Sequence, residues 1–296
     1  MDPFVMLKKD MKEKQELVNI ILDRYLPRKD EYPKDIHKAL RYSLFAGGKR
    51  LRPYLCMLAY QLYKEDVGPI IPVAAAIEML HTYTLIHDDL PDIDDDEYRR
   101  GKKSCHTMFS EGVALLAGDS LLVNAFEMIT YAEIPDSLKV RFVRELAVAS
   151  GIKGLISGQM VDILSEGKKV DKKTLNYIHH NKTARLINLS LRLGALAGKA
   201  PAKELAIIEE YGSKIGLAFQ IVDDLLDIEG SQAKLGKTIG KDEAQGKATF
   251  PAVYGIEESR EMAAKLTEQA KNAISGLGQR SLLLRTLADQ LSSRKS

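Results

Sequence analysis

Cysteine is scarce in this sequence. Only Cys56 and Cys105 occur among 296 residues, and their spacing matches no metal-binding motif. A disulfide framework is not expected, and a reducing compartment is favoured. Long apolar runs are also missing, because no stretch of eighteen apolar residues occurs and the N-terminal residues mix charged with apolar side chains. We expect a cytoplasmic protein with neither a signal peptide nor a stable membrane span.

An excess of charge of either sign is absent as well. Lysine and arginine total 43 and aspartate and glutamate total 41, so the formal net charge is +2. Proteins that bind polyanions over a broad surface usually carry a strong positive charge. A nucleic-acid partner is therefore not expected, and any basic binding site in this chain has to be local.

Strand signals are missing too, since no sustained alternation of apolar and polar residues occurs and no Asn-Gly or Asp-Gly dipeptide marks a hairpin. Helical patterns fill the chain instead. Three segments are apolar on almost every face and are predicted to be central, buried helices. They are residues 72–90, 113–133 and 203–228. Three further segments have one polar face and are predicted to be outer or flanking helices. They are residues 137–150, 173–198 and 257–274.

Glycine and proline punctuate these segments, but no stretch of linker-like composition divides the chain. We therefore predict an all-α fold with one large helical domain over residues 1–296. Its helices should pack around the few that are fully apolar.

The first chemical signal is the sequence HDDLPDIDDDEYRRGK, residues 87–102, with seven carboxylates between Asp88 and Glu97. An acidic run is often only a solvated loop. Here it ends an apolar helix, where carboxylates oppose the helix dipole. Pro91 disfavours helix at the preceding residue, so the chain should turn and bring Asp94 back toward Asp88 and Asp89.

A second acidic cluster follows in FQIVDDLLD, residues 219–227. Asp223 and Asp227 are four residues apart and share one face of an apolar helix, with Asp224 beside them. Two buried carboxylate clusters repel each other unless cations lie between them. Carboxylates without histidine or cysteine suit Mg²⁺ or Mn²⁺, and Mg²⁺ usually binds through one or two carboxylates plus phosphates of the substrate. The pattern predicts a diphosphate held through several Mg²⁺ ions.

Basic residues that could bind phosphate occur in four places. FAGGKRLRP, residues 45–53, places two glycines before Lys49, Arg50 and Arg52 at a probable helix start, where backbone N–H groups favour an anion. His81 is the second place, on the same helical face as Asp88. Arg99 and Arg100, which follow the first acidic cluster, are the third. Lys237, Lys241 and Lys247 are the fourth, in GKTIGKDEAQGK after the second acidic cluster. His81 alone is more typical of an ordinary core or surface histidine, and Arg99 with Arg100 could simply balance charge. A mobile surface loop is the less favoured interpretation of the lysine-rich segment, because it directly follows buried carboxylates.

Taken together, HDDLPDIDDDEYRRGK, FQIVDDLLD, GGKRLRP and GKDEAQGKATFP resemble the trans-isoprenyl diphosphate synthases, in particular the short-chain farnesyl and geranylgeranyl diphosphate synthases of bacterial type. The motifs stand in the family's order between residues 47 and 251. The resemblance implies an all-α fold with central helices around a deep cavity, and a homodimer with the active site inside each subunit. It also implies the substrates isopentenyl diphosphate and an allylic diphosphate, either dimethylallyl or geranyl diphosphate.

The resemblance also implies roles for individual residues, with about three Mg²⁺ ions per site. Metal ligands would be Asp88 and Asp94 of the first cluster and Asp223 of the second, with Asp89, Asp224 and Asp227 as further acidic members of the catalytic site. The allylic diphosphate would meet Arg99, Lys182, Thr183, Gln220, Lys237 and Lys247. Isopentenyl diphosphate would bind to Lys49, Arg52, His81 and Arg100. One departure is visible, because the family often reads KTGAL or KTGGL where this chain reads KTARL at residues 182–186.

Product length is expected to depend on the depth of the cavity. Tyr83 lies five residues before Asp88, about 7.5 Å along a helix, and Thr84 follows it. In the family an aromatic residue at this position closes the cavity, so the resemblance favours the C15 product, (2E,6E)-farnesyl diphosphate. The alternatives are a C20 geranylgeranyl diphosphate synthase, a terpene cyclase of similar fold, a non-catalytic partner subunit, and a helical protein that merely binds divalent cations.

Overall fold

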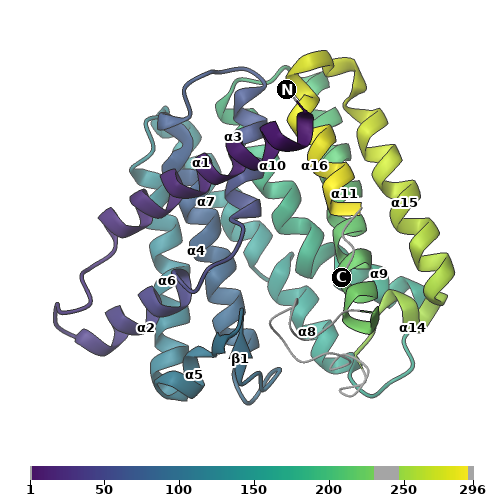
Figure 1. Cartoon of the computed structure of the whole chain (residues 1–296). Coiled ribbons are helices and arrows are strands. Elements are labelled where there is room, and N and C mark those ends of the chain that lie inside the picture. The colour runs from purple at the N-terminus through teal and green to yellow at the C-terminus, as the bar shows by residue number, and fades with distance from the viewer. Residues whose placement is uncertain (1, 230–246, 293–296) are drawn as a thin grey trace.

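The computed structural model describes residues 2–229 and 247–292. Within them the protein is helical, and the only strands are a two-residue antiparallel pair, β1 (Tyr98–Arg99) and β2 (Lys102–Lys103). The helices stand roughly side by side, with α4 next to α6 and α11 next to α15 (Figure 1). The predicted all-α fold is confirmed.

The N-terminal half contains seven helices, with a short 3₁₀ turn at Gly68–Ile70. They are α1 (Pro3–Tyr25), α2 (Lys34–Leu44), α3 (Leu51–Gln61), α4 (Ile71–Asp88), α5 (Cys105–Met108), α6 (Glu111–Thr130) and α7 (Asp136–Ser150).

The rest of the described chain has seven more, with a π-helical turn at His180–Ala184 and a 3₁₀ segment at Ser275–Ser281. They are α8 (Leu155–Ser165), α9 (Lys172–His179), α10 (Arg185–Ala197), α11 (Ala202–Glu229), α14 (Phe250–Tyr254), α15 (Ile256–Ala273) and α16 (Leu282–Ser292). All six predicted helical segments are helical, although the segment 173–198 contains the π-helical turn between α9 and α10.

Helix α4 is the central element that the sequence predicts. Pro72 stands in its first turn, where a missing N–H costs no hydrogen bond. Nearly every side chain from Ile71 to Leu80 is buried, against α1, α3, α6 and α10. By length and composition alone, α4 with its preceding turn and α6 could each cross a membrane, but 83% of that window of α4 is buried inside the protein. The burial identifies α4 as a core helix and places its C-terminal aspartates at the end of the core.

The prediction that 113–133 is fully buried is wrong for part of its surface. Leu115, Leu116 and Val123 of α6 have 46%, 57% and 64% of their surface exposed, whereas Ala117 and Leu121 are fully buried. An apolar helix sequence predicts that the helix is shielded from water. It does not show whether each face packs against the same chain or against another molecule. Helix α6 therefore presents an apolar face outward.

The prediction that 173–198 is an outer helix is also wrong for α10. Leu191, Leu193 and Ala195 are fully buried. The polar stripe that made the segment look amphipathic faces neighbouring helices instead of water, because Arg192 donates hydrogen bonds to Glu145 of α7 and Glu209 of α11. Ion pairs between helices thus allow α10 to be a central helix.

Candidate active site

The turn after α4 folds the first acidic cluster back on itself. The helix ends at Asp88, two residues before Leu90, as Pro91 requires. The backbone N–H of Asp94 then donates to the carbonyl of Asp88 at 2.8 Å, and that of Asp96 donates to the carbonyl of Asp89 at 3.2 Å. The predicted return of Asp94 toward Asp88 and Asp89 is confirmed.

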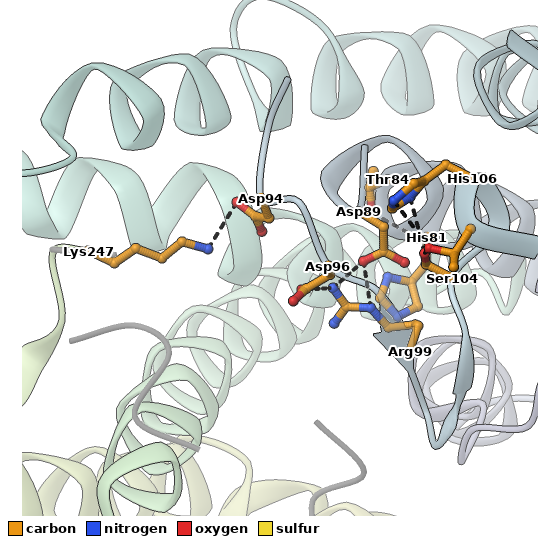
Figure 2. Close-up of polar contacts among 10 residues, drawn as sticks. His81, Thr84, Asp89, Asp94, Asp96, Arg99, Ser104, His106 and Lys247 are labelled. Carbon is orange, nitrogen blue, oxygen red and sulfur yellow. Dashed lines mark hydrogen bonds and ion pairs between the residues drawn. The ribbon is translucent and has the colours of Figure 1, made fainter. Parts of the chain in front are cut away.

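The carboxylate of Asp89 forms an ion pair with Arg99 of β1. The guanidinium Nε of Arg99 donates to Asp89 Oδ1 at 2.8 Å, and its Nη2 donates to Asp96 at 2.8 Å (Figure 2). Burial raises the pKa of Asp89 to about 6 against the opposing effect of Arg99, and the acidic neighbours raise the pKa of Arg99. Asp89 therefore positions Arg99, which leaves Asp88 and Asp94 as the carboxylates of this turn that can face a cation.

Lys182 brings a positive charge to Asp88. It lies in the π-helical turn, and its Nζ donates to Asp162 of α8 at 2.6 Å. Burial raises the pKa of Asp88, and Lys182 is the strongest influence that lowers it; the pKa of Lys182 is in turn raised, against its burial, by Asp88 and Asp162. The lysine thus remains charged between two carboxylates.

Asp162 is a site residue that the sequence interpretation missed. It is buried, with 7% of its surface exposed, and it is the only charged residue in α8. A lone aspartate in an otherwise uncharged helix was the available signal. A β-carbon on Gly158, one turn earlier, would lie only 2.6 Å from the backbone nitrogen of Lys182, so α8 packs directly on the lysine's turn.

Asp94 is paired with Lys247 from the far end of the chain. The Nζ of Lys247 lies 2.9 Å from Asp94 Oδ1, and both side chains are largely buried (Figure 2). Lys247 therefore lies against the first acidic cluster, and its binding of the allylic diphosphate stays a prediction. Lys237, also predicted to bind phosphate, and its neighbour Lys241 lie outside the described residues.

The second cluster divides its aspartates between two tasks. Asp224 accepts a hydrogen bond from Gln220 Nε2 at 2.7 Å and another from the backbone N–H of Phe250 at 2.9 Å. Gln220 Oε1 in turn accepts from the hydroxyl of Thr183 at 2.6 Å, so two residues predicted together do meet. Asp224 is a structural anchor between α11 and α14.

The other two aspartates of α11 face different surroundings. Asp227 is buried and lines a cavity of about 550 Å³ that Asp224, Lys247 and Lys168 also line. Asp223 is half-buried and raises the pKa of Arg52 against the lowering effect of burial, so it lies within electrostatic reach of the basic site. The second cluster therefore borders both sets of cations.

Three of the predicted basic residues converge. Arg52 Nη1 lies 3.2 Å from His81 Nε2, and the guanidinium of Arg100 donates to the carbonyl of Gly47 at 2.6 Å. A β-carbon on Gly48 would lie 2.5 Å from Arg100 Cζ, so the glycine makes room for this arginine. Burial, then Arg52 and Arg100, hold the pKa of His81 well below its usual value, so this histidine is neutral among cations. Lys49 is exposed at the rim of the same loop.

Arg50 stands between two predicted anion-binding residues but turns inward. It has a φ of 50°, and its guanidinium donates to Glu78 at 2.8 Å and to the carbonyl of Leu44 at 2.6 Å. Only 4% of Arg50 is exposed. This buried ion pair fixes the GGKR loop on α4, so Lys49 and Arg52 can point elsewhere.

An apolar cavity of about 180 Å³ lies directly below Asp88. Its walls come from α4 and α8 and include both residues predicted to form its floor. The lining residues are Tyr83, Thr84, His87, Asp88, Ile93, Leu155, Ile156, Gln159, Met160 and Ile163. The site thus joins carboxylates and cations at the top to an apolar chamber underneath.

The carboxylates fit a hard divalent cation, because all the nearby acidic donors are aspartate oxygens. In the described part of the chain, no three histidine, cysteine or acidic side chains form a ready-made metal cluster. Mg²⁺ takes few protein ligands and completes its shell with water and substrate phosphate. Asp88, Asp94 and Asp223 are the residues that could hold such ions.

Known proteins of similar sequence and structure bind an isoprenyl diphosphate or are named for the synthesis of one. The family model described as polyprenyl synthetase matches residues 33–278. Farnesyl diphosphate synthase of Geobacillus stearothermophilus is 44% identical over 264 residues, 88% of this chain and 89% of that protein. Geranylgeranyl diphosphate synthase of Cyanophora paradoxa is 42% identical over 287 residues, 96% of this chain and 95% of that protein. The crystal structure of geranyltransferase from Helicobacter pylori, complexed with magnesium and isoprenyl diphosphate, superposes with a TM-score of 0.85 at 29% identity, covering 98% of this chain and 96% of that one.

Proposed function

Because the chain belongs to the polyprenyl synthetase family and is a prenyltransferase, we propose that it condenses isopentenyl diphosphate with dimethylallyl and geranyl diphosphate to give farnesyl diphosphate. The observation that carries the C15 product is the cavity below Asp88. It measures about 180 Å³, which is small beside the ~300–1,000 Å³ of typical ligand pockets. The side chain of Tyr83 forms part of its wall. Relatives include both farnesyl and geranylgeranyl diphosphate synthases, and the small cavity supports the farnesyl alternative in this proposal.

The cofactor we propose is Mg²⁺, about three ions per site, held by Asp88, Asp94 and Asp223, with Mn²⁺ as a substitute. The all-oxygen donor set supports it, and the similar Helicobacter pylori geranyltransferase was solved with magnesium. When bound, such ions neutralise negative charge on a diphosphate leaving group.

Basic side chains of the protein also neutralise negative charge on the diphosphate in this proposal. Lys182 remains charged beside Asp88, Arg99 is held rigid by Asp89 and Asp96, and Lys247 lies against Asp94. Preorganised cations of this kind stabilise the negative charge that grows on a diphosphate as its C–O bond breaks. The apolar cavity below them excludes water from an allylic cation.

The second substrate has its own place in the proposal. Arg52, His81 and Arg100 form a basic site with the exposed Lys49 at its rim. This site holds the diphosphate of isopentenyl diphosphate, and its double bond is thereby kept next to the allylic carbon, which is a proximity effect. In this proposal the departing diphosphate is the proton acceptor.

We also propose that the protein works as a homodimer in the cytoplasm. The outward apolar face of α6 supports the dimer, since Leu115, Leu116 and Val123 are exposed on it. Exposed apolar patches of this kind are typical of protein interfaces. Size-exclusion chromatography with light scattering should give twice the chain mass of 32.9 kDa.

The deciding experiment is product analysis. The purified protein is incubated with isopentenyl diphosphate, Mg²⁺ and, separately, the C5, C10 and C15 allylic diphosphates, and the dephosphorylated products are sized. A dominant C15 product that disappears with a chelator is the expected result. A C20 product keeps the mechanism and overturns the cavity argument. No coupled product from any primer favours a terpene cyclase or a non-catalytic subunit.

Asp162→Asn should lower kcat/KM for the allylic substrate about tenfold or more. The neutral amide removes the carboxylate that holds Lys182, and a hydrogen bond to a charged group contributes about 1.5–3 kcal/mol. Asp162→Glu should recover part of the loss, and the exposed Asp136→Asn on α7 serves as the control. Wild-type kinetics for Asp162→Asn would remove Asp162 from this positioning role.

A further inference from the structure

The wall of the cavity toward α6 is formed by His87, a residue to which the proposed function assigns no task. His87 follows Tyr83 by one helical turn on α4, and both line the cavity. Their rings meet edge to face, with centroids 5.4 Å apart and planes at 90°. The two rings therefore act as one continuous wall.

Helix α6 holds His87 from behind. The ring Nε2 lies 3.1 Å from the carbonyl oxygen of Leu115 and 3.7 Å from Asp119 Oδ1. Between these two residues on the helix stands Gly118, which is buried. A β-carbon there would lie 2.2 Å from His87 Nε2 and 2.3 Å from its Cδ2. The imidazole thus occupies the space that any side chain at position 118 would need.

We infer that Gly118 is a specificity-determining residue, which sets the product length by seating the His87 ring against α6 and out of the cavity. The inference rests on the proposed function. Contacts of a β-carbon below 3.0 Å are essentially never seen, so an alanine at 118 has to displace the ring by at least about 0.8 Å. One side of the ring contacts α6, another borders the cavity, and only 20% of the side chain is exposed, so we expect the ring to move toward the cavity or against Tyr83, which also lines it. Either movement narrows a chamber of only about 180 Å³.

Gly118→Ala should therefore shorten the product. We expect the ratio of C15 to C10 product to fall at least about tenfold, the lower end of the discrimination that one methylene-sized change produces in an apolar pocket. His87→Ala should have the opposite effect and raise the ratio of C20 to C15 product. The double variant Gly118→Ala/His87→Ala removes the clash and should behave as His87→Ala alone, a strongly non-additive result.

Gly112→Ala is the matched control. It lies near the start of the same helix, and its β-carbon would meet no atom within 4 Å. Both substitutions raise helix propensity by similar amounts, so they differ in the contact with His87. Gly112→Ala should keep the wild-type product ratio, with a melting temperature equal to or slightly above that of the wild type.

The assay sizes the products of each variant from C5 and C10 primers and, in parallel, measures calorimetric binding of C10 and C15 allylic thiolodiphosphates, which do not react readily. The C15 analogue should lose more affinity than the C10 analogue in Gly118→Ala. An unchanged product ratio in Gly118→Ala overturns the inference. Should that variant fail to fold, an unchanged C20 to C15 ratio in His87→Ala overturns it instead. If the wild type forms no coupled product, the proposed function fails, whereas a productive wild type with unresponsive variants sinks only this inference.

Discussion

Replacing Asp88 by asparagine should lower kcat by at least about 10²–10³-fold while the protein stays folded. The magnitude is that of removing one preorganised group that acts on the developing charge, and Asp88 is also a proposed cation ligand beside Lys182. The measurement is steady-state turnover with isopentenyl diphosphate and geranyl diphosphate at saturating Mg²⁺.

The stability of this variant makes the test sharper. Burial raises the pKa of Asp88 above its value in the unfolded chain, so the ionised form opposes folding once the pH exceeds the unfolded pKa. Loss of the carboxylate also removes its attraction for the buried Lys182, and the two effects oppose each other, so the asparagine variant should melt near the wild-type temperature at neutral pH. Asp92→Asn, at an exposed position of the same turn, is the control and should keep full activity. Near-normal turnover of Asp88→Asn would contradict its assignment.

Replacing Tyr83 by alanine should shift the main product from C15 toward C20. The tyrosine ring forms part of the cavity wall and is 5% exposed, so its removal opens the chamber next to Thr84. A contact of this size in an apolar pocket changes selectivity about 10–200-fold. The measured quantity is the ratio of C20 to C15 product from the geranyl primer, together with the rate of C20 formation from the farnesyl primer.

Two further variants separate cavity size from other effects. Tyr83→Phe keeps the ring and should keep the C15 product, whereas Tyr32→Ala removes an exposed tyrosine and should change nothing. Loss of a large buried side chain costs about 3–5 kcal/mol of folding stability. The melting temperature of Tyr83→Ala therefore has to be measured and has to lie above the assay temperature. A folded Tyr83→Ala protein that still stops at C15 would exclude Tyr83 as the floor of the cavity.

Local chemistry explains why much of this site could be predicted from the sequence. Pro91 ends α4 and returns Asp94 to Asp88, and Gly47 and Gly48 open a loop that exposes Lys49. These features depend on a few adjacent residues, so they can be predicted from a short stretch of the sequence.

Features that depend on distant partners could not be predicted in the same way. Asp162 matters because it meets Lys182, twenty residues later, in a π-helical turn that no pattern announces. Helix α10 looks amphipathic because Arg192 is charged, yet Glu145 and Glu209 on other helices neutralise it and bury the helix. Pairings between helices are absent from the periodicity of either helix alone.

The double hydrogen bond of Asp224 has a consequence for interpreting mutational scans. Its carboxylate accepts from Gln220 on its own helix and from the backbone N–H of Phe250, whose ring stacks on His179 with centroids 5.0 Å apart. An alanine scan of Asp223, Asp224 and Asp227 should give inactive variants at all three positions. The loss of activity at Asp224 should have a different cause from the loss at the other two. Loss at Asp224 arises from misplacement of the segment that carries Lys247, so it should be accompanied by faster proteolysis and lower expression. An activity screen alone would not distinguish loss of a chemical role at Asp224 from loss of these hydrogen bonds.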